Sequence, residues 1–469
     1  MTREKLQELL EGDFDEAVTA ISLKPEPKTK DPLKEYNVHE HDVFDPVKRP
    51  NVKRKKKTGE ALADREVNRI GIAMQKMIVG RAAAFLCANP IVYKAAPKNP
   101  AEEKMWAAFK KVNENNKLDY KNQNILEKRM SETEVAEIWY LQDIDEDDDY
   151  WTGTEIKAKQ KPRLFISAVS LLDKMYPVWD GQDSLVAFAR QWKEKDDDGK
   201  DVDHFDVYTD DFVYEGTKNG STWEVNKVEN PVKKVLAIYH WQEDVEWANA
   251  KPQISRLEFL GSNLGDSNDK TMSPIFFVEG KLDSLPDGTA GRVINGPAGS
   301  KAYYVTSDNA PESLKMEVDM HERNMYITTD TVRLDTEVLQ GIGQTSGVAL
   351  ELLFMPAHLK ASKHAGTFGE CVQRRVNLIK KMIATIDPSV KEGISLTITP
   401  TFDFFLPKDV TGIVNYLANA TMGDKPSLSQ ETAVNILQGA IGGDGKAELE
   451  KIKSEAAEEE TKLDVELGK

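Results

Sequence analysis

The feature that most constrains the fold is a long amphipathic helical pattern that begins after Ser346-Gly347 and ends near Ile386. Pro356 lies inside it and is expected to kink or interrupt the helix, because proline removes a backbone hydrogen-bond donor. Apolar side chains recur at helical spacing over the second half, at Phe368, Cys371, Val372, Val376, Ile379, Met382, Ile383 and Ile386. A stripe of this length needs an apolar partner surface.

The chain before this helix alternates between helical and strand-like patterns, which indicates an α+β fold. A helical pattern runs from Thr58 to Asn89-Pro90, and two more helices are expected from Ala101 and from Lys121. A strand follows at Glu137–Leu141. Residues 160–240 are β-rich, and two dipeptides typical of hairpin turns lie among them, Asp198-Gly199 and Asn219-Gly220.

Two further helices are expected on either side of a Gly-, Asp- and Ser-rich stretch. The first begins near Trp241, and the second begins at Asp308–Glu312 with a side-chain cap and an early proline and runs to about Val332. Short strands are expected between them at Pro274–Val278 and Ala302–Val305. The last 60 residues predict three short helices, one of them with a capping box formed by Ser427 and Gln430.

The N-terminal 58 residues predict an extended arm with at most a short helix around Leu6, Leu9 and Leu10, because the stretch from Pro25 to Pro50 is polar and proline-rich. The basic run Lys53–Lys57 is compatible with a solvated tether, a contact to nucleic acid, or a contact to an acidic neighbouring subunit. The chain as a whole is acidic, with a net charge of −17 over 469 residues. Neither a membrane-spanning helix nor a secretory signal is expected.

Motifs that carry chemistry are not found. Gly296–Lys301 lacks the spacing of a phosphate-binding loop, and Gly341-Ile342-Gly343 lacks a third glycine. The histidines and the two cysteines do not have the spacing of a metal site, so no metal and no cofactor are expected. The acidic run Asp143–Asp149 is compatible with a solvated loop or with an opportunistic cation site, since it lacks the glycine and the final carboxylate of a calcium loop.

Five stretches, in their order and spacing, resemble the portal (head-to-tail connector) proteins of tailed bacteriophages with long noncontractile tails. The most specific is Ser346-Gly347-Val348-Ala349-Leu350, which is similar to the start of the family's long helix after the tunnel loop. The other four stretches are Arg65–Pro90, Phe188–Thr209, Asp244–Asn263 and Ser427–Thr432.

The resemblance implies a ring-forming fold with wing, stem, clip and crown regions. The regions are an extended N-terminal arm at 1–58, a wing at 59–240, a first stem helix at 241–265, a clip at 266–310, a second stem helix at 311–332, a tunnel loop at 333–347, a wing helix and strand at 348–408, and a helical crown with a charged tail at 409–469.

The resemblance also implies the function. The chain is expected to form a dodecameric ring at one capsid vertex of the virion, assembled in the host cytoplasm, through which double-stranded DNA is packaged and ejected without sequence specificity. Expected partners are the terminase large subunit, the head-to-tail adaptor, and the major capsid and scaffolding proteins. No enzymatic activity is expected, because ATP hydrolysis belongs to the terminase. The alternatives are another virion structural protein, such as a capsid or adaptor protein, and a nucleic-acid-processing enzyme.

The resemblance places two sets of functional residues. The tunnel loop nearest the DNA would present Asp335, Glu337, Gln340, Gln344 and Thr345. The clip would dock partners through Pro274, Phe276, Phe277, Arg292, Lys301 and Tyr303.

Overall fold

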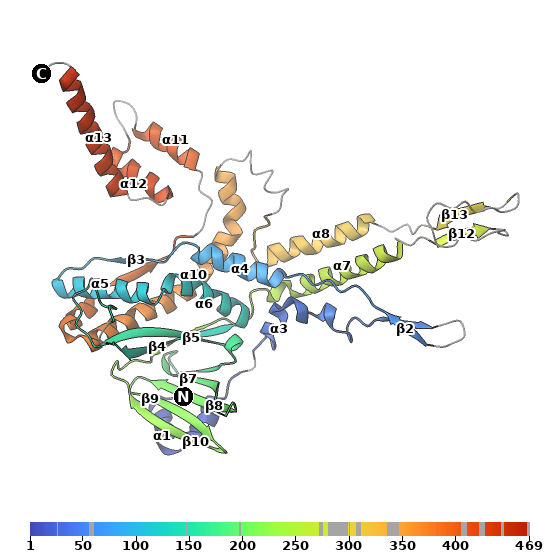
Figure 1. Cartoon of the computed structure of the whole chain (residues 1–469), viewed down its shortest axis with the longest axis horizontal. Helices are drawn as coiled ribbons and strands as arrows, with labels where there is room; N and C mark the ends of the chain where they lie inside the picture. The colour runs from blue at the N-terminus through green and yellow to red at the C-terminus, as the bar shows by residue number, and fades with distance from the viewer. Residues whose placement is uncertain are drawn as a thin grey trace. The chain divides into compact units, whose positions relative to one another are not determined.

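The computed structural model of the chain describes residues 1–25, 27–55, 61–145, 148–196, 198–271, 275–279, 299, 301–305, 311–334, 347–404, 410–421, 427–441 and 445–466 (Figure 1). The chain divides into two compact units. Unit 1 comprises Met1–Thr331 and Lys360–Phe404, and unit 2 comprises Val332–Leu359 and Phe405–Lys469. Among the helices in the described ranges, none is long and apolar enough to cross a membrane.

A five-stranded antiparallel sheet of unit 1 accounts for most of the β-rich region predicted over residues 160–240. Its order is β10-β9-β8-β7-β6. The strands are β6 (Lys174–Trp179), β7 (Leu185–Lys195), β8 (Asp201–Thr209), β9 (Phe212–Asn219) and β10 (Thr222–Glu229). Both predicted hairpin turns are confirmed. Gly199 and Gly220 have φ angles of 77° and 63°, a region of backbone space that favours glycine.

The N-terminal segment is not the extended arm that its composition predicts. Residues Arg3–Gly12 form helix α1 and Phe14–Ile21 form helix α2, and both pack on one face of the five-stranded sheet. The buried side chains of this contact are Leu6, Leu10, Phe14, Ala17 and Ile21 from the helices with Val178, Val186, Ala187, Ala189, Phe205, Val207 and Tyr214 from the sheet. This apolar contact offsets the conformational entropy that an extended arm would keep.

The main core of unit 1 lies where helices α5 (Pro100–Asn115), α6 (Leu118–Glu132) and α10 (Gly347–Ile386) meet a three-stranded sheet of order β11-β4-β5. The strands are β4 (Glu134–Asp143), β5 (Gln160–Ala168) and β11 (Ala237–Trp241). Figure 1 shows the helices lying over this sheet. The predicted long helix is confirmed as α10, and Pro356 lies inside it without ending it.

Unit 1 contains several smaller elements besides this core. Helix α4 (Met74–Cys87) starts much later than the helical pattern from Thr58 predicts, because residues Ala61–Arg65 form strand β2 and pair with β1 (Val52–Lys55). Strand β14 (Ile398–Thr401) pairs with β3 (Val92–Ala95) after the 3-10 helix η5 (Pro388–Ser395). The predicted strand from Ile394 to Phe405 is therefore shorter than its alternating pattern.

Unit 2 contains the three C-terminal helices, α11 (Val410–Thr421), α12 (Gln430–Ile441) and α13 (Gly445–Glu466). The predicted capping box is wrong by two residues. Ser429 caps α12, since its Oγ accepts a hydrogen bond of 3.2 Å from the Thr432 N–H. Gln430 is the first residue of the helix and cannot be the third-position partner of a box that starts at Ser427.

A buried ionic cluster joins the elements of the main core. Glu137 of β4 accepts two hydrogen bonds from Arg375 of α10, at 2.8 Å from Nε and 2.5 Å from Nη2. His240 of β11 lies 2.7 Å from the same carboxylate, and Arg375 also donates to Asn122 Oδ1 of α6 at 2.6 Å. The side chains of Glu137, Arg375 and His240 have no exposed surface. Three charges removed from water are tolerable only when their hydrogen bonds are made to one another.

The pKa values of the cluster follow from this pairing. Burial alone would raise the pKa of Glu137, but Arg375 and His240 together lower it to about 2. Burial alone would lower the pKa of His240, but Cys371 and Glu137 beside it raise the value to about 9. Near neutral pH the cluster therefore holds an ionised carboxylate between two cations.

Breaking this cluster is predicted to be costly. Replacing Arg375 with alanine leaves Glu137 as a buried charge with a weaker partner, so the free energy of unfolding is expected to fall by about 3–5 kcal/mol. The matched control is Arg374→Ala, which removes an exposed ion pair to Glu370 on the same helix and should cost about 0.5 kcal/mol or less. Urea unfolding of both variants measures the difference; equal losses would contradict the account.

A second buried carboxylate lies on the opposite face of β8 from α1 and α2. Asp206 is 8% exposed and accepts a hydrogen bond of 2.7 Å from Trp192 Nε1. Burial raises its pKa to about 6, although Trp192 and Arg190 act in the lowering direction.

Asp206 is therefore predicted to make stability depend on pH. Its folded-state pKa lies above its unfolded value, so the folded state binds the proton more tightly, and the stabilising contribution is lost as pH rises from about 4 to about 6. Asp206→Asn keeps an acceptor for Trp192 without the charge. Its unfolding free energy should exceed that of the wild type at pH 7 by on the order of 1–3 kcal/mol and match it below about pH 4. Urea titrations across this range test the prediction; a gain that does not change with pH would refute it.

Candidate functional site

A pair of helices with a hairpin between them forms the region that the sequence predicts as stem and clip. Helix α7 (Lys251–Thr271) and helix α8 (Pro311–Thr328) lie side by side, and strands β12 (Ile275–Glu279) and β13 (Lys301–Val305) lie beyond their ends (Figure 1). Arg256 of α7 binds Glu317 of α8 through Nε and Nη2 at 2.9 and 2.7 Å from Oε1. Both side chains are partly exposed, so this ion pair orients the helices more than it stabilises them.

The bounds of both helices differ from those predicted. Helix α7 begins at Lys251 rather than near Trp241, with Pro252 in its first turn, and it continues beyond residue 265 to Thr271. Helix α8 ends at Thr328 rather than at Val332. Asp330 has a φ of 49°, and the Thr331 N–H bonds back to the Tyr326 carbonyl at 3.0 Å, which together stop the helix.

The predicted clip residues are brought together only in part. The backbones of β12 and β13 pair in an antiparallel register that places Phe277 opposite Tyr303 and Phe276 opposite Tyr304. Lys301 is exposed at the start of β13. Pro274 and Arg292 lie outside the described residues. The two predicted strands are confirmed, their pairing is an additional finding, and a docking role for these residues stays a prediction.

The predicted tunnel-loop residues Asp335, Glu337, Gln340, Gln344 and Thr345 all lie outside the described residues. What the structure describes is the chain on either side of them. Residues up to 334 follow α8, and α10 begins at Gly347.

A ladder of hydrogen bonds holds α7, and the sequence analysis did not find it. Three side chains spaced one helical turn apart on α7 accept backbone N–H groups from alternate residues of the segment before α4. Glu258 accepts from Ile72 at 2.9 Å and Ser262 from Ile70 at 2.9 Å. Asp266 accepts from Asn68 at 2.8 Å. Residues 66–73, which carry these donors, are called the strap below.

The regularity of the ladder has a geometric cause. Four residues of α-helix rise about 6 Å, and two residues of extended chain advance about 6.6 Å. Side chains at every fourth position of a helix can therefore meet every second N–H of a chain laid along it. Water cannot replace these bonds, because Glu258 and Ser262 are only 2% and 0% exposed.

Two further side chains tie the strap region to α7. Arg49 donates to Asn263 Oδ1 at 2.8 Å and to Asp266 Oδ2 at 2.6 Å. His41 lies 2.6 Å from Glu258 Oε1 through its Nδ1. Burial acts to lower the pKa of His41, but the hydrogen bond and the charge of Glu258 raise it overall. His41, Arg49 and the strap are thus fixed along α7.

Removing the middle rung is predicted to loosen the strap. Ser262→Ala leaves the Ile70 N–H without its acceptor, so the free energy of unfolding should fall by about 1–3 kcal/mol. The matched control is Ser255→Ala on the same helix, where the structure shows no hydrogen bond among the described residues. Amide hydrogen exchange should accelerate at Ile70 in the first variant only. Unchanged exchange at Ile70 would show that the rung is not made.

No candidate metal site is found among the described residues. No group of three or more His, Cys, Asp or Glu side chains among them could hold a metal ion. Of the acidic run, Asp143 accepts from Gln160 Nε2 at 2.9 Å and Asp148 pairs with Lys161, while Glu146 and Asp147 lie outside the described residues. Part of this run is therefore engaged in protein contacts rather than in cation binding.

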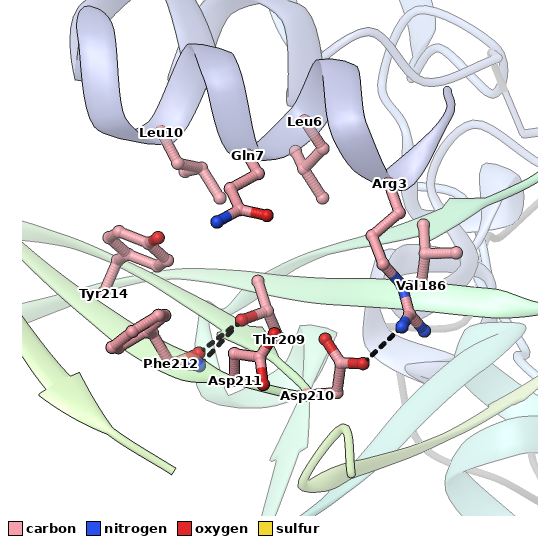
Figure 2. Close-up of a pocket in the computed structure, with 10 residues that line it drawn as sticks. All are labelled: Arg3, Leu6, Gln7, Leu10, Val186, Thr209, Asp210, Asp211, Phe212 and Tyr214. Carbon is pink, nitrogen blue, oxygen red and sulfur yellow. Dashed lines mark hydrogen bonds and ion pairs between the residues drawn. The ribbon is translucent and has the colours of Figure 1, made fainter. Parts of the chain in front are cut away.

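Figure 2 shows a small pocket between α1 and the sheet. Its lining mixes apolar side chains with polar and charged ones, among them an ion pair of 2.6 Å between Arg3 and Asp210. The residues around it are Arg3, Leu6, Gln7, Leu10, Val186, Thr209, Asp210, Asp211, Phe212 and Tyr214. This set contains no nucleophile beside a base, and the pocket is the seam left where α1 packs on the strands.

Comparison with known proteins identifies one family. The family described as phage portal protein, SPP1 Gp6-like, matches residues 28–462. No curated protein sequence matches the chain. Among solved structures, a chain from the neck of an empty gene transfer agent particle is 8% identical with a TM-score of 0.41, covering 77% of this chain and 88% of that chain. A chain from the neck of the native particle is 9% identical with a TM-score of 0.40, covering 90% and 97%.

Proposed function

We propose, because this chain belongs to the SPP1 Gp6-like family of phage portal proteins, that it forms a dodecameric ring whose central channel conducts double-stranded DNA. As a portal protein it acts at the capsid vertex, and the family is structural rather than catalytic. The family match over residues 28–462 carries the proposal. The helix–hairpin–helix arrangement of α7, β12, β13 and α8 supports it, because this order is what the stem and clip of such a protein need.

In this proposal α7 and α8 are the stem helices and the β12–β13 hairpin belongs to the clip. The terminase large subunit would dock on the clip during packaging, and the head-to-tail adaptor would replace it afterwards. Phe276, Phe277, Lys301 and Tyr303, with Pro274 and Arg292, are the proposed docking residues. Capsid and scaffolding proteins would contact the ring as the particle assembles in the host cytoplasm, and the chain itself would hydrolyse no nucleotide.

The charge of the chain fits a conduit. Each phosphate that a lysine or arginine neutralises adds affinity for DNA, so a basic channel would hold the DNA it must release. Helix α8 carries four acidic side chains, at Glu312, Glu317, Asp319 and Glu322, against two basic ones. The proposed tunnel loop adds Asp335 and Glu337. Acidic walls would lower the barrier between successive steps of sliding DNA.

The ring can be tested directly by negative-stain imaging of the purified protein. Rings with a central hole are expected, with twelve subunits by native mass spectrometry. Shells or filaments would contradict the proposal and would favour another structural role in the virion.

The acidic tunnel loop is predicted to affect the rate of packaging but not assembly. Changing Asp335→Asn and Glu337→Gln together should leave ring formation intact and slow DNA packaging, because the loop would then repel phosphates less. The measurement is the packaging rate in a purified motor assay, with rings of both proteins first compared by imaging. A packaging rate equal to that of the wild type would refute the channel role of these two residues.

A further inference from the structure

The segment that contains the proposed tunnel loop is an excursion from unit 1. The chain leaves unit 1 after Thr331 and returns to it at Lys360. Both ends of the excursion meet at one ammonium group. Lys360 Nζ donates to the Thr329 carbonyl at 2.7 Å and lies 2.7 Å from Glu246 Oε1.

This junction is buried, which is unusual for a lysine. Lys360 is 9% exposed and Thr329 is 4% exposed. Lysine is almost never buried unless it is paired, and here its partners are one carboxylate and one backbone carbonyl. The carboxylate is held as an anion: burial acts to raise the pKa of Glu246, but His364 and Lys360 lower it to about 2.

The position of the ammonium also suits the end of α8. The last carbonyls of a helix have no partner within it, and a cation near them is favoured by the helix dipole. Thr329 is the first residue after α8, directly before Asp330 reverses the chain with its φ of 49°. A lysine that follows the excursion in sequence therefore caps the helix that precedes it.

Neighbouring contacts hold Lys360 in place along α10. His364 Nε2 lies 3.2 Å from the same Glu246 oxygen. Arg129 of α6, which is 4% exposed, donates to Thr367 Oγ1 at 2.7 Å. Lys360, His364 and Thr367 occupy successive turns of α10. The helix that carries the lysine is therefore fixed in unit 1 by further contacts.

We propose that Lys360 is a positioning residue for the channel: it closes the excursion 332–359 at its base by joining the end of α8, the segment before α7 and the start of the unit 1 part of α10. The turn that ends α8 and the first residues of the unit 1 part of α10 are then held together at one point only while this junction is made. The proposal deepens the proposed function, since it rests on the channel role of residues 333–347. The closure itself depends only on the contacts of Glu246, Thr329 and Lys360.

The test uses full-length rings of the wild type and three variants. Lys360→Met removes the ammonium, and Lys360→Arg keeps a cation of similar reach. Lys363→Met is the matched control, because Lys363 is exposed on the same helix and makes no ion pair with the described residues. Amide hydrogen exchange is measured at residues 329–334 and 347–359, with β4 and residues 376–384 as references.

Lys360→Met should accelerate exchange at 329–334 and 347–359 by roughly tenfold to a hundredfold, the effect of losing one charge-assisted hydrogen bond. Exchange in the reference segments should not change, Lys360→Arg should restore most of the protection, and Lys363→Met should match the wild type. An equal rise in all segments would overturn the proposal, because Lys360 would then serve general stability alone. Unchanged exchange in every segment would also overturn it.

A second variant covers failure of Lys360→Met to fold. Glu246→Gln removes the ion pair but leaves the bond from Lys360 to the Thr329 carbonyl, so protection at 329–334 should persist. Loss of that protection would show that the ion pair to Glu246, and not the bond to the Thr329 carbonyl, closes the excursion, and would overturn the part of the proposal that rests on that bond.

Packaging assays on the same rings separate this proposal from the proposed function. If exchange rises at the excursion and packaging slows, both stand. If exchange rises and packaging is unchanged, the closure stands and the channel role of the loop fails. If packaging slows without any rise in exchange, the closure fails.

Discussion

The buried contact between Glu137 and Arg375 is the interaction on which the rest of unit 1 depends. It joins a strand from the first third of the chain to a helix from the last third, and His240 and Asn122 bring two more elements to the same point. Because an unpaired charge in this core would be far more costly than an apolar mismatch, the cluster accepts only one register of α10 on β4. The apolar stripe of α10 is then aligned with α5, with α6 and with the sheet.

The two ends of the proposed stem are attached differently from this core. Apolar side chains supply most of the contact between α10 and the three-stranded sheet. Helix α7 also buries apolar side chains, but hydrogen bonds to Glu258, Ser262 and Asp266 hold its central and C-terminal part, and a bond from Lys360 holds the end of α8. Polar contacts require particular distances and directions, while apolar packing tolerates small shifts. The placement of α7 and α8 therefore depends on the directions of particular polar contacts. The placement of α10 depends on the volumes of its apolar side chains.

Much of the fold could be predicted from periodicity, and the exceptions have physical causes. The stripe from Phe368 to Ile386 and the two Gly-containing turns were sufficient for α10 and for the β-hairpins. Arg375 lies on the apolar face of this helix but was not counted in the stripe. A charged residue on an apolar face indicates a buried ion pair. Likewise, Glu137 lies inside an otherwise apolar strand. Both residues could therefore be recognised in the sequence as unusual, but that they pair with each other could not.

The N-terminal segment and the strap show a different limit. The helices α1 and α2 are short, and their apolar residues are buried only because the sheet covers them. The prediction of an extended arm therefore followed the proline-rich composition of the segment after them. The rungs of the ladder each join a side chain to a backbone N–H, and every residue has such a group regardless of its identity. Nothing in the sequence at Ile70 or Ile72 distinguishes them as donors. The proposed tunnel loop was placed by family resemblance alone, since a polar segment with glycines has no period.

The spacing of that ladder has a mechanical consequence for a protein that would bear the force of a DNA motor. The strap runs along α7, so a force along the helix axis is shared by its three hydrogen bonds at the same time. A pull across the axis would open the rungs one after another, as in a zipper, and would need much less force. The strap would thus make α7 stiff along the direction in which DNA travels and compliant across it, without any additional apolar surface.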